Sequence, residues 1–332
     1  MMLDLQELQK RVFNIKNQAD FQNTALDIFN YQYNNNIIYN SFVDGLGLDP
    51  SNVRSIYEIP FLPVEFFKSH KIVTGNSPIE KIFESSGTTV VIKAKHYINN
   101  LNLYAESFLR TFKMFYGDPE EYHILALLPS YLEREGSSLV YMAEYLIKRS
   151  NSSLSGFYIN NVEDLITTYT RAKSENRKIL LLGVSFALLD LAEKYSPDLS
   201  GAIVMETGGM KGRRKELTRF ELHSILKEQL GVSSIHSEYG MTELLSQAYS
   251  KDDGIFYCPP WLKMLIRDPL DPLTIYTVPD KTGGLNIIDL ANFNSCSFIL
   301  TGDLGKLRED GGFEVLGRFD NSDIRGCNLL VE

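Results

Sequence analysis

Cysteine is scarce in this sequence. The three cysteines, Cys258, Cys296 and Cys327, are far apart and form no Cys-x-x-Cys pair. Disulfide-rich secreted scaffolds and structural zinc sites need closely and regularly spaced cysteines, so neither is expected here. Unpaired thiols are typical of proteins in a reducing compartment, and we therefore expect a cytoplasmic location.

Long apolar runs and an excess of basic charge are also lacking. No stretch approaches the ~18 apolar residues of a membrane span, and residues 1–14 resemble an amphipathic helix rather than a signal peptide. The formal net charge is −9. Because nucleic-acid binding depends on clustered Lys and Arg, no nucleic-acid partner is expected.

Strand-like and helical patterns alternate through the first three quarters of the chain. The 332 residues, 44% of them hydrophobic, suffice for one large domain or two modest ones. Residues 3–40 predict two helices, and a proline-containing extended stretch follows. Strands are then predicted at 81–83, 123–128, 178–182 and 202–205, and helices at 98–116, 136–149, 162–175, 186–195 and 215–230. This alternation predicts a largely parallel sheet covered by helices.

The pattern changes at about residue 250. Short strand-like runs separated by Gly, Pro and Asp occupy 262–266, 273–276, 285–290, 298–300 and 313–316. We therefore divide the chain into an α/β part, residues 1–250, and a mostly antiparallel β subdomain, residues 251–332.

Four short motifs contain residues suited to nucleotide chemistry. The first, Ser85, Ser86, Gly87, Thr88 and Thr89, follows a predicted strand. A loop of small hydroxyl residues around a glycine can wrap phosphates with its amides and hydroxyls. It is not a Walker A loop, and taken alone it is more typical of a surface turn.

The second motif runs from Tyr239 to Glu243 and reads Tyr-Gly-Met-Thr-Glu. The tyrosine suits stacking on a purine, Thr242 suits contact with phosphate, and the Glu243 carboxylate suits Mg²⁺, which favours carboxylate and phosphate oxygens together. A strand end followed by a helix capped by Thr242 would explain the same residues.

The last two motifs lie near the C-terminus. Asp303, in Thr-Gly-Asp, suits a ribose diol, although a β-turn would also use this residue. Arg318 suits ribose or phosphate. Cys327 lies two residues from Arg325, whose charge would favour a reactive thiolate, while the alternative is a buried structural cysteine.

In this order and at these intervals, the motifs resemble those of the adenylate-forming superfamily of acyl-CoA synthetases, luciferases and peptide-synthetase adenylation domains. The closer resemblance is to the acyl-protein synthetase family of the bacterial bioluminescence fatty-acid reductase complex. The matching stretches are 59–63, 66–68, 85–89, 127–132, 137–139, 206–209, 239–243, 301–303 and 322–327.

This resemblance implies an α/β fold with the architecture of the adenylate-forming large domain: helix-covered, largely parallel sheets and a C-terminal antiparallel β subdomain. It implies ATP and Mg²⁺ as cofactors and a carboxylic acid, fatty in the closer family, as substrate. The implied roles are phosphate binding for Ser85, Ser86, Gly87, Thr88 and Thr89, adenine binding for Gly208, Gly209 and Tyr239, α-phosphate contact for Thr242, Mg²⁺ binding for Glu243, and ribose binding for Asp303 and Arg318.

The resemblance also implies transfer of the acyl group to a cysteine near the C-terminus, a position that Cys327 fits. The sequence ends at Glu332, soon after Asp320, where the superfamily has its hinge. The usual small C-terminal domain with its adenylation lysine is therefore expected to be absent, which favours an on-chain thiol over CoA. An acyl-CoA reductase-like protein or an acyl carrier protein would then receive the acyl group. Val90 stands where the phosphate loop usually has another glycine.

Three alternatives remain open on the sequence. The segment from Gly183 to Ala187 nearly matches a hydrolase nucleophile elbow centred on Ser185, with His223 or His236 as the base. The chain could also bind nucleotide or acyl group without turnover, or it could pass the acyl group directly to CoA, a carrier protein or an amine. His96, His123 and His236 lack metal-ligand spacing and are expected to be structural.

Overall fold

Helices and strands alternate along most of the chain. The structure, a computed structural model, describes residues 4–85, 92–128, 136–209 and 217–319. Its α-helices are α1 (Leu5–Val12), α2 (Gln18–Asn35), α3 (Ile37–Gly45), α4 (Phe66–Ser69), α5 (Leu101–Tyr116), α6 (Ser138–Ser150), α7 (Val162–Ala172), α8 (Ser185–Tyr195) and α9 (Arg219–Leu230). Its strands are β1 (Leu62–Pro63), β2 (Lys81–Glu84), β3 (Lys95–Ile98), β4 (Tyr122–Leu127), β5 (Gly156–Phe157), β6 (Lys178–Val184), β7 (Ala202–Thr207), β8 (Ile235–Tyr239), β9 (Ala248–Ser250), β10 (Ile255–Phe256), β11 (Leu262–Arg267), β12 (Ile275–Tyr276), β13 (Thr282–Asp289), β14 (Phe298–Leu307) and β15 (Phe313–Arg318). Short 3₁₀ turns are η1 (Pro50–Asn52), η2 (Pro119–Glu121) and η3 (Leu290–Asn292).

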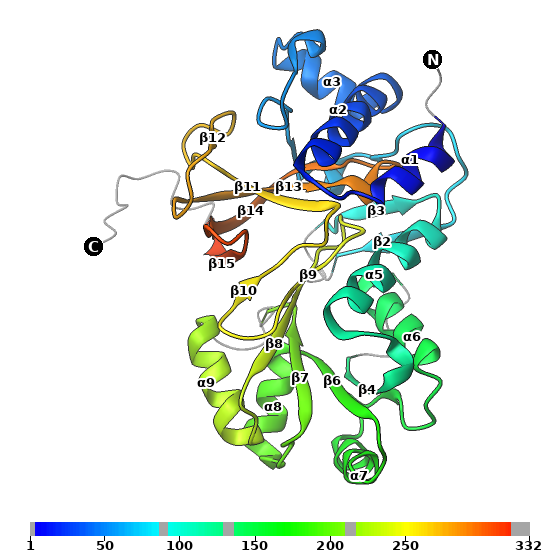
Figure 1. Cartoon of the computed structure of the whole chain (residues 1–332), viewed down its shortest axis with the longest axis vertical. Helices are drawn as coiled ribbons and strands as arrows, with labels where there is room; N and C mark the ends of the chain where they lie inside the picture. Colours follow the sequence, from blue (N-terminus) through cyan, green and yellow to red (C-terminus); the bar gives the residue numbers. More distant parts are fainter. Residues whose placement is uncertain (1–3, 86–91, 129–135, 210–216, 320–332) are drawn as a thin grey trace.

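Two large sheets occupy opposite halves of the molecule, with β9 and β10 running between them (Figure 1). One is six-stranded, in the order β5-β4-β6-β7-β8-β9. The other is seven-stranded, in the order β10-β15-β14-β13-β11-β12, with β1 paired to β14. Strands β2 and β3 form a separate antiparallel pair.

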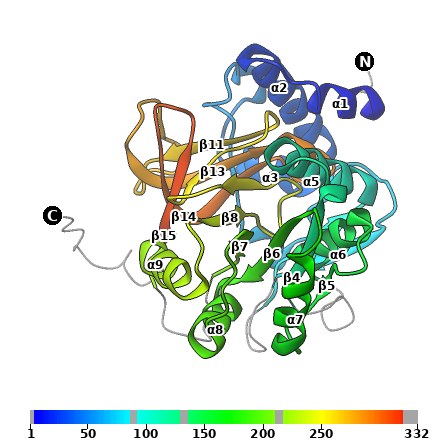
Figure 2. The ribbon, with the colours of Figure 1, turned by 60° about the horizontal axis from the view of Figure 1, so that its bottom comes forward.

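The six-stranded sheet is parallel except at its β9 edge, as the alternating pattern predicted. β4, β6, β7 and β8 run in the same direction. Strand β6 is buried at every residue after Lys178, and α6, α7, α8 and α9 pack against the parallel strands (Figure 2). Because parallel strands end on the same side of a sheet, the residues that follow β6, β7 and β8 meet at one edge.

Local signals explain where individual helices begin and end. The side chain of Thr218 accepts from the backbone N–H of Glu221, whose own side chain returns to the Thr218 backbone, and this capping box starts α9. Gly231 then ends the helix with a φ of 65°, a left-handed conformation that glycine adopts without strain.

The N-terminal region contains three helices rather than the two predicted. Asn36 makes the difference, because it is both the C-cap of α2 and the N-cap of α3, where its side chain accepts from the backbone N–H of Tyr39. The same side chain is buried and donates to the Ser295 carbonyl oxygen at 2.9 Å. A helical pattern that continues across this cap hides the break in the sequence.

The predicted C-terminal antiparallel β region is confirmed: β11, β13, β14 and β15 are joined in antiparallel pairs. This sheet also recruits earlier segments. β1 runs parallel to β14, and α2 is fixed to the sheet by Gln32, whose Nε2 donates to the Phe293 carbonyl oxygen at 3.0 Å.

A hydrogen-bonded link joins the two large sheets. β9 belongs to the parallel sheet and β10 to the antiparallel sheet, and Tyr249 and Tyr257 exchange two backbone hydrogen bonds, at 3.2 and 2.9 Å. The turn between β9 and β10 contains Asp253 and Gly254, with φ of 57° and 68°. The relative position of the two sheets is therefore fixed partly by backbone bonds.

Replacing Gln32 with alanine is expected to destabilise the fold. Gln32 is fully buried, and its Oε1 also accepts from the Ser297 backbone N–H at 3.0 Å. Unpaired buried polar groups cost about 1–3 kcal/mol, so we expect a loss of that size in urea unfolding. The exposed Asn34→Ala variant on the same helix should change stability by less than about 0.5 kcal/mol, and an equal loss in both would contradict this role.

Candidate active site

The predicted nucleotide residues come together where the parallel strands end and the antiparallel sheet begins. Gly208 and Gly209 follow β7, and Tyr239 ends β8. Asp303 lies on β14 and Arg318 ends β15, directly opposite it in the register. Segments far apart in the sequence therefore converge on one edge.

Asp303 is hydrogen-bonded to two other residues of this group. Its Oδ2 accepts from the Tyr239 hydroxyl at 2.8 Å, and its Oδ1 accepts from Arg318 Nε at 3.0 Å. Its own backbone N–H donates to Thr301 Oγ1 at 3.1 Å, which fixes the turn of the Thr-Gly-Asp motif. The Asp303 side chain is only 11% exposed, whereas that of Arg318 is 73% exposed. The arginine thus presents its remaining donors to solvent.

The ring of Tyr239 is enclosed by aromatic neighbours. Phe256 and Phe313 meet it edge to face, with centroids 5.9 and 5.6 Å away. Burial, together with the adjacent Asp303 carboxylate, raises the pKa of Tyr239 well above its usual range, so the hydroxyl stays protonated as a donor. The Tyr239 hydroxyl donates to Asp303, and stacking of the ring on adenine stays a prediction.

Thr242 and Glu243 are held through their backbone carbonyl groups. His96 Nδ1 lies 2.8 Å from the Thr242 carbonyl oxygen, and Asn292 Nδ2 donates to the Glu243 carbonyl oxygen at 2.8 Å. Burial lowers the pKa of His96 to about 4, although the Thr242 and Asn292 oxygens favour the charged ring. His96 is therefore neutral at neutral pH.

The Glu243 carboxyl is buried, and among the described residues no ion pair offsets its desolvation. Burial raises its pKa to about 7, against smaller opposing effects from its own backbone, Arg318 and Lys68. Within the described ranges, no group of three His, Cys, Asp or Glu could hold a metal ion. Mg²⁺ is usually held by one or two carboxylates together with substrate phosphates, and a single desolvated carboxylate beside a nucleotide fits that pattern.

Gly208 and Gly209 leave the end of β7 with φ of 74° and 50°. Both are exposed, and a Cβ built on Gly209 would meet nothing within 4 Å. Glycine adopts such positive φ values without strain and leaves the peptide face open to a flat ligand. The geometry is compatible with the predicted adenine contact, which stays a prediction.

Just before these glycines, Glu206 anchors a buried polar cluster. Its Oε1 lies 3.6 Å from Arg219 Nε and 3.7 Å from His223 Nε2. Burial alone would raise the pKa of Glu206, but His223, Arg219 and Ser185 outweigh it, and the pKa is lowered. Arg219 also donates to the Val315 carbonyl oxygen at 3.2 Å, so it connects β7 with β15.

The predicted phosphate loop lies largely outside the described residues, which include Ser85 but not Ser86, Gly87, Thr88 or Thr89. Ser85 Oγ accepts from the Ala94 backbone N–H at 3.0 Å, which ties the two ends of this segment together. Lys93 and Lys95, the two lysines that follow it, lie 3.5 and 3.7 Å from the Glu84 carboxylate. Cys327 also lies outside the described residues.

The geometry of Ser185 does not support the hydrolase alternative. Ser185 is 1% exposed, and its hydroxyl donates to Glu206 Oε2 at 2.8 Å. His223 faces Glu206 and Ser237, while His236 faces the Tyr116 hydroxyl at 3.1 Å. A nucleophilic serine must be accessible and bonded to its base, so Ser185 is a buried structural donor.

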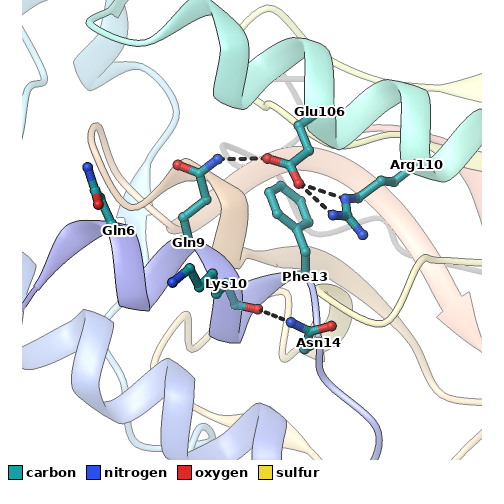
Figure 3. A pocket seen from close by; sticks show the side chains of 7 residues that line it. All are labelled: Gln6, Gln9, Lys10, Phe13, Asn14, Glu106 and Arg110. Carbon is teal, nitrogen blue, oxygen red and sulfur yellow. Dashed lines mark hydrogen bonds and ion pairs between the residues drawn. The ribbon is translucent and has the colours of Figure 1, made fainter.

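A cavity of about 290 Å³ lies between α1 and α5, away from these residues (Figure 3). It is lined by Gln6, Gln9, Lys10, Phe13, Asn14, Glu106 and Arg110. The central carboxylate of this cavity already has partners, because Glu106 accepts from Gln9 Nε2 at 2.7 Å and from Arg110 Nε at 2.8 Å. We therefore place the candidate site at the sheet edge.

Sequence reasoning missed several residues that hold this edge in place. Asn292 and Arg219 were not singled out, and His96 was expected only to be structural. Arg267 is also buried, and its Nη2 donates to the Thr301 carbonyl oxygen at 2.7 Å while its guanidinium lies over the Phe319 ring. No local motif marks such residues, because their partners lie far away in the sequence.

Glu243→Gln is expected to change how stability depends on pH. Free glutamate titrates near 4.5, whereas Glu243 in the folded protein titrates near 7. Between these values the unfolded chain releases the proton and the folded chain keeps it, so unfolding becomes easier as pH rises through this window. The shift corresponds to about 3 kcal/mol at most.

Urea unfolding from pH 4 to 8 measures this effect. The wild-type curve should fall more steeply than the Gln variant's between about pH 4.5 and 7. Parallel curves would show that Glu243 titrates normally in the folded protein.

Comparison with solved structures shows the fold. ATP-bound MatB from Rhodopseudomonas palustris has a TM-score of 0.54 at 18% identity, over 74% of this chain and 49% of that one. The Bacillus subtilis O-succinylbenzoate coenzyme A synthetase MenE, in complex with AMP, has a TM-score of 0.52 at 19% identity, over 74% and 50%. 2-Hydroxyisobutyryl-CoA ligase, in an open conformation with 2-HIB-AMP and CoA, has a TM-score of 0.68 at 14% identity, over 94% and 77%. The chain has the adenylate-forming fold and spans about half the length of the first two structures.

In the described part of the chain, no helix is both long and apolar enough to cross a membrane.

Sequence comparison identifies the family. The search of curated proteins gave no match. The family model described as acyl-protein synthetase, LuxE, matches residues 12–332. The chain therefore belongs to the acyl-protein synthetase, LuxE, family.

Proposed function

We propose that this protein activates a carboxylic acid of the fatty-acid class with ATP and Mg²⁺ as an acyl-adenylate, and that Cys327 then receives the acyl group. The observation that carries the proposal is the convergence of Tyr239, Asp303 and Arg318 beside the Thr242–Glu243 loop. Family membership supports it independently.

In the first half-reaction, a carboxylate oxygen of the acid attacks the α-phosphorus of ATP. The bond between the α-phosphorus and the bridging oxygen breaks, and pyrophosphate leaves with the electron pair. Such a reaction depends mainly on positioning the groups and stabilising the developing charge. Mg²⁺, held by Glu243, would offset charge on the phosphates.

The residues at the sheet edge have matching tasks in this proposal. Each Asp303 oxygen accepts one hydrogen bond from the described residues, and a carboxylate oxygen can accept a second, here from a ribose hydroxyl. Arg318 is exposed enough to reach ribose or phosphate. Thr242 would contact the α-phosphate, and Gly208 and Gly209, with Tyr239, would line the adenine site.

The phosphates would be wrapped by the hydroxyl-rich loop. Ser85, Ser86, Gly87, Thr88 and Thr89 offer backbone amides and side-chain hydroxyls for this task. The described residues on either side support the proposal, since Ser85 and Ala94 are joined by hydrogen bonds in both directions, each 3.0 Å long.

In the second half-reaction, the Cys327 thiolate attacks the acyl carbonyl carbon. The carbon–oxygen bond to the phosphate breaks, AMP leaves, and a thioester remains. The other two cysteines are poorly suited to this step, because burial raises the pKa of Cys258 and of Cys296 to about 12. An acyl-CoA reductase-like protein or an acyl carrier protein would then accept the acyl group.

Acid-dependent exchange between ATP and pyrophosphate, followed by intact mass measurement, tests both half-reactions. Cys327→Ser should keep the exchange, because adenylation precedes the thiol, but it should lose the acyl adduct. Cys258→Ser should keep both. An adduct that survives Cys327→Ser would place the acceptor elsewhere. Exchange without any adduct would favour direct transfer to CoA, a carrier protein or an amine, and absence of exchange would favour a binding subunit.

Asp303→Asn is expected to raise the KM for ATP by about 10- to 100-fold, since hydrogen bonds to charged groups contribute about 1.5–3 kcal/mol. Exchange kinetics at varied ATP concentration measure this. Asp310→Asn is a matched control. Asp310 lies in the exposed turn between β14 and β15, and it likewise accepts from a tyrosine hydroxyl, that of Tyr257, at 2.9 Å. Equal changes in KM for the two variants would argue against a ribose site at Asp303.

A further inference from the structure

His96 stands between two parts of the candidate site. It lies on β3, opposite Phe83 of β2, and these two strands lead into and out of the segment with the predicted phosphate loop. The ring is fully buried, and Phe67 of α4 packs edge to face against it at 5.7 Å. The side chain is therefore fixed in position from more than one element.

His96 and Asn292 hold the two peptide groups that flank the Glu243 Cα. His96 Nδ1 lies 2.8 Å from the carbonyl oxygen of Thr242, which belongs to the peptide before Glu243. Asn292 Nδ2 donates to the carbonyl oxygen of Glu243, which belongs to the peptide after it. With both peptide planes fixed, the direction of the Glu243 Cα–Cβ bond is fixed as well.

Asn292 holds the second of these two peptides. Its amide nitrogen also donates to the Cys296 carbonyl oxygen at 2.9 Å, which leaves its Oδ1 facing His96 Nε2 at 3.1 Å. The loop continues into Leu245, whose backbone N–H donates to the buried Asp289 carboxylate at 2.8 Å. Buried hydrogen bonds therefore fix successive residues from Thr242 onward, in a loop with no helix or strand of its own.

We infer that His96 is a positioning residue that couples the phosphate-loop strands to the Glu243 carboxylate by donating Nδ1–H to the Thr242 carbonyl oxygen. Both contacts are to oxygens that only accept, and a neutral ring has one N–H; we assign it to Nδ1, whose contact is the shorter. The inference rests on the proposed function, because it gives Glu243 the task of holding Mg²⁺ with ATP. A residue that orients a metal ligand typically contributes 10- to 100-fold to metal affinity.

Two substitutions separate the ring nitrogens. The amide nitrogen of Asn lies close to the position of Nδ1, whereas that of Gln reaches the position of Nε2. His96→Asn can therefore still donate to Thr242, and His96→Gln cannot. His123→Asn is the control, because His123 is also buried and its Nδ1 bonds Ser152 Oγ at 2.7 Å, on a strand remote from the site.

The test measures Mg²⁺-dependent ATP binding by calorimetry, together with ATP–pyrophosphate exchange. His96→Gln should raise the half-saturating Mg²⁺ concentration by about 10- to 100-fold, with little change in the KM for the acid. His96→Asn should stay near wild type. His123→Asn should lower the Tm without changing the Mg²⁺ dependence.

A folded His96→Gln protein with normal Mg²⁺ dependence would overturn the inference, as would equal losses in the Asn and Gln variants. If the His96 variants do not fold, Asn292→Ala tests the peptide on the other side of Glu243, which Asn292 holds, and normal Mg²⁺ dependence there would also overturn the inference. Wild-type protein that binds ATP with Mg²⁺ but shows no exchange would refute the proposed adenylation while still allowing the test of His96. Wild type without Mg²⁺-dependent ATP binding would refute both.

Discussion

The arrangement of the site depends on the hydrogen bonds that Tyr239 and Arg318 donate to the Asp303 carboxylate. A buried carboxylate needs hydrogen-bond partners to offset its lost hydration. Asp303 takes one from Tyr239 at the end of the parallel sheet and one from Arg318 at the end of the antiparallel sheet. The two sheets must therefore meet at this residue for its charge to be accommodated. Arg219 repeats the connection nearby, since it reaches Glu206 on β7 and the backbone of β15.

Two of the buried glutamates at this edge, Glu206 and Glu243, have opposite electrostatic environments. Glu206 is surrounded by Arg219, His223 and Ser185, which keep its pKa low despite burial. Glu243 has no comparable set of partners in the part of the chain that the structure describes, and burial raises its pKa to about 7. Where the pKa values of two carboxyl groups are shifted in opposite directions in this way, their roles differ. Glu206 is occupied by internal partners, whereas Glu243 would gain most from an incoming cation.

Much of the fold could be predicted from periodicity. The apolar run of β6 after Lys178 and the helices around it follow from local pattern, as does the change to antiparallel strands after residue 250. The break between α2 and α3 could not, because the Asn36 cap depends on a burial site formed with Ser295. Nor could the pairing of β1 with β14, which brings together residues 62–63 and 299–300.

For the site, the sequence indicated the residues that short motifs mark, and the structure brings Tyr239, Asp303 and Arg318 together as the motif order suggested. It did not indicate His96 or Asn292, because their partners are backbone carbonyl groups that any residue would supply. It also left Ser185 open as a nucleophile, since a strand, a turn and a serine look alike whether the hydroxyl faces solvent or a buried carboxylate.

The link between β9 and β10 has a consequence for the thermodynamics of ligand binding. Two sheets joined only by side chains could rotate against each other, and a ligand at their junction would have to restrict that motion. Here Tyr249 and Tyr257 continue the backbone ladder from one sheet to the other. The junction is thus largely organised before any ligand arrives, so little conformational entropy is lost on binding and more of the contact energy remains as affinity.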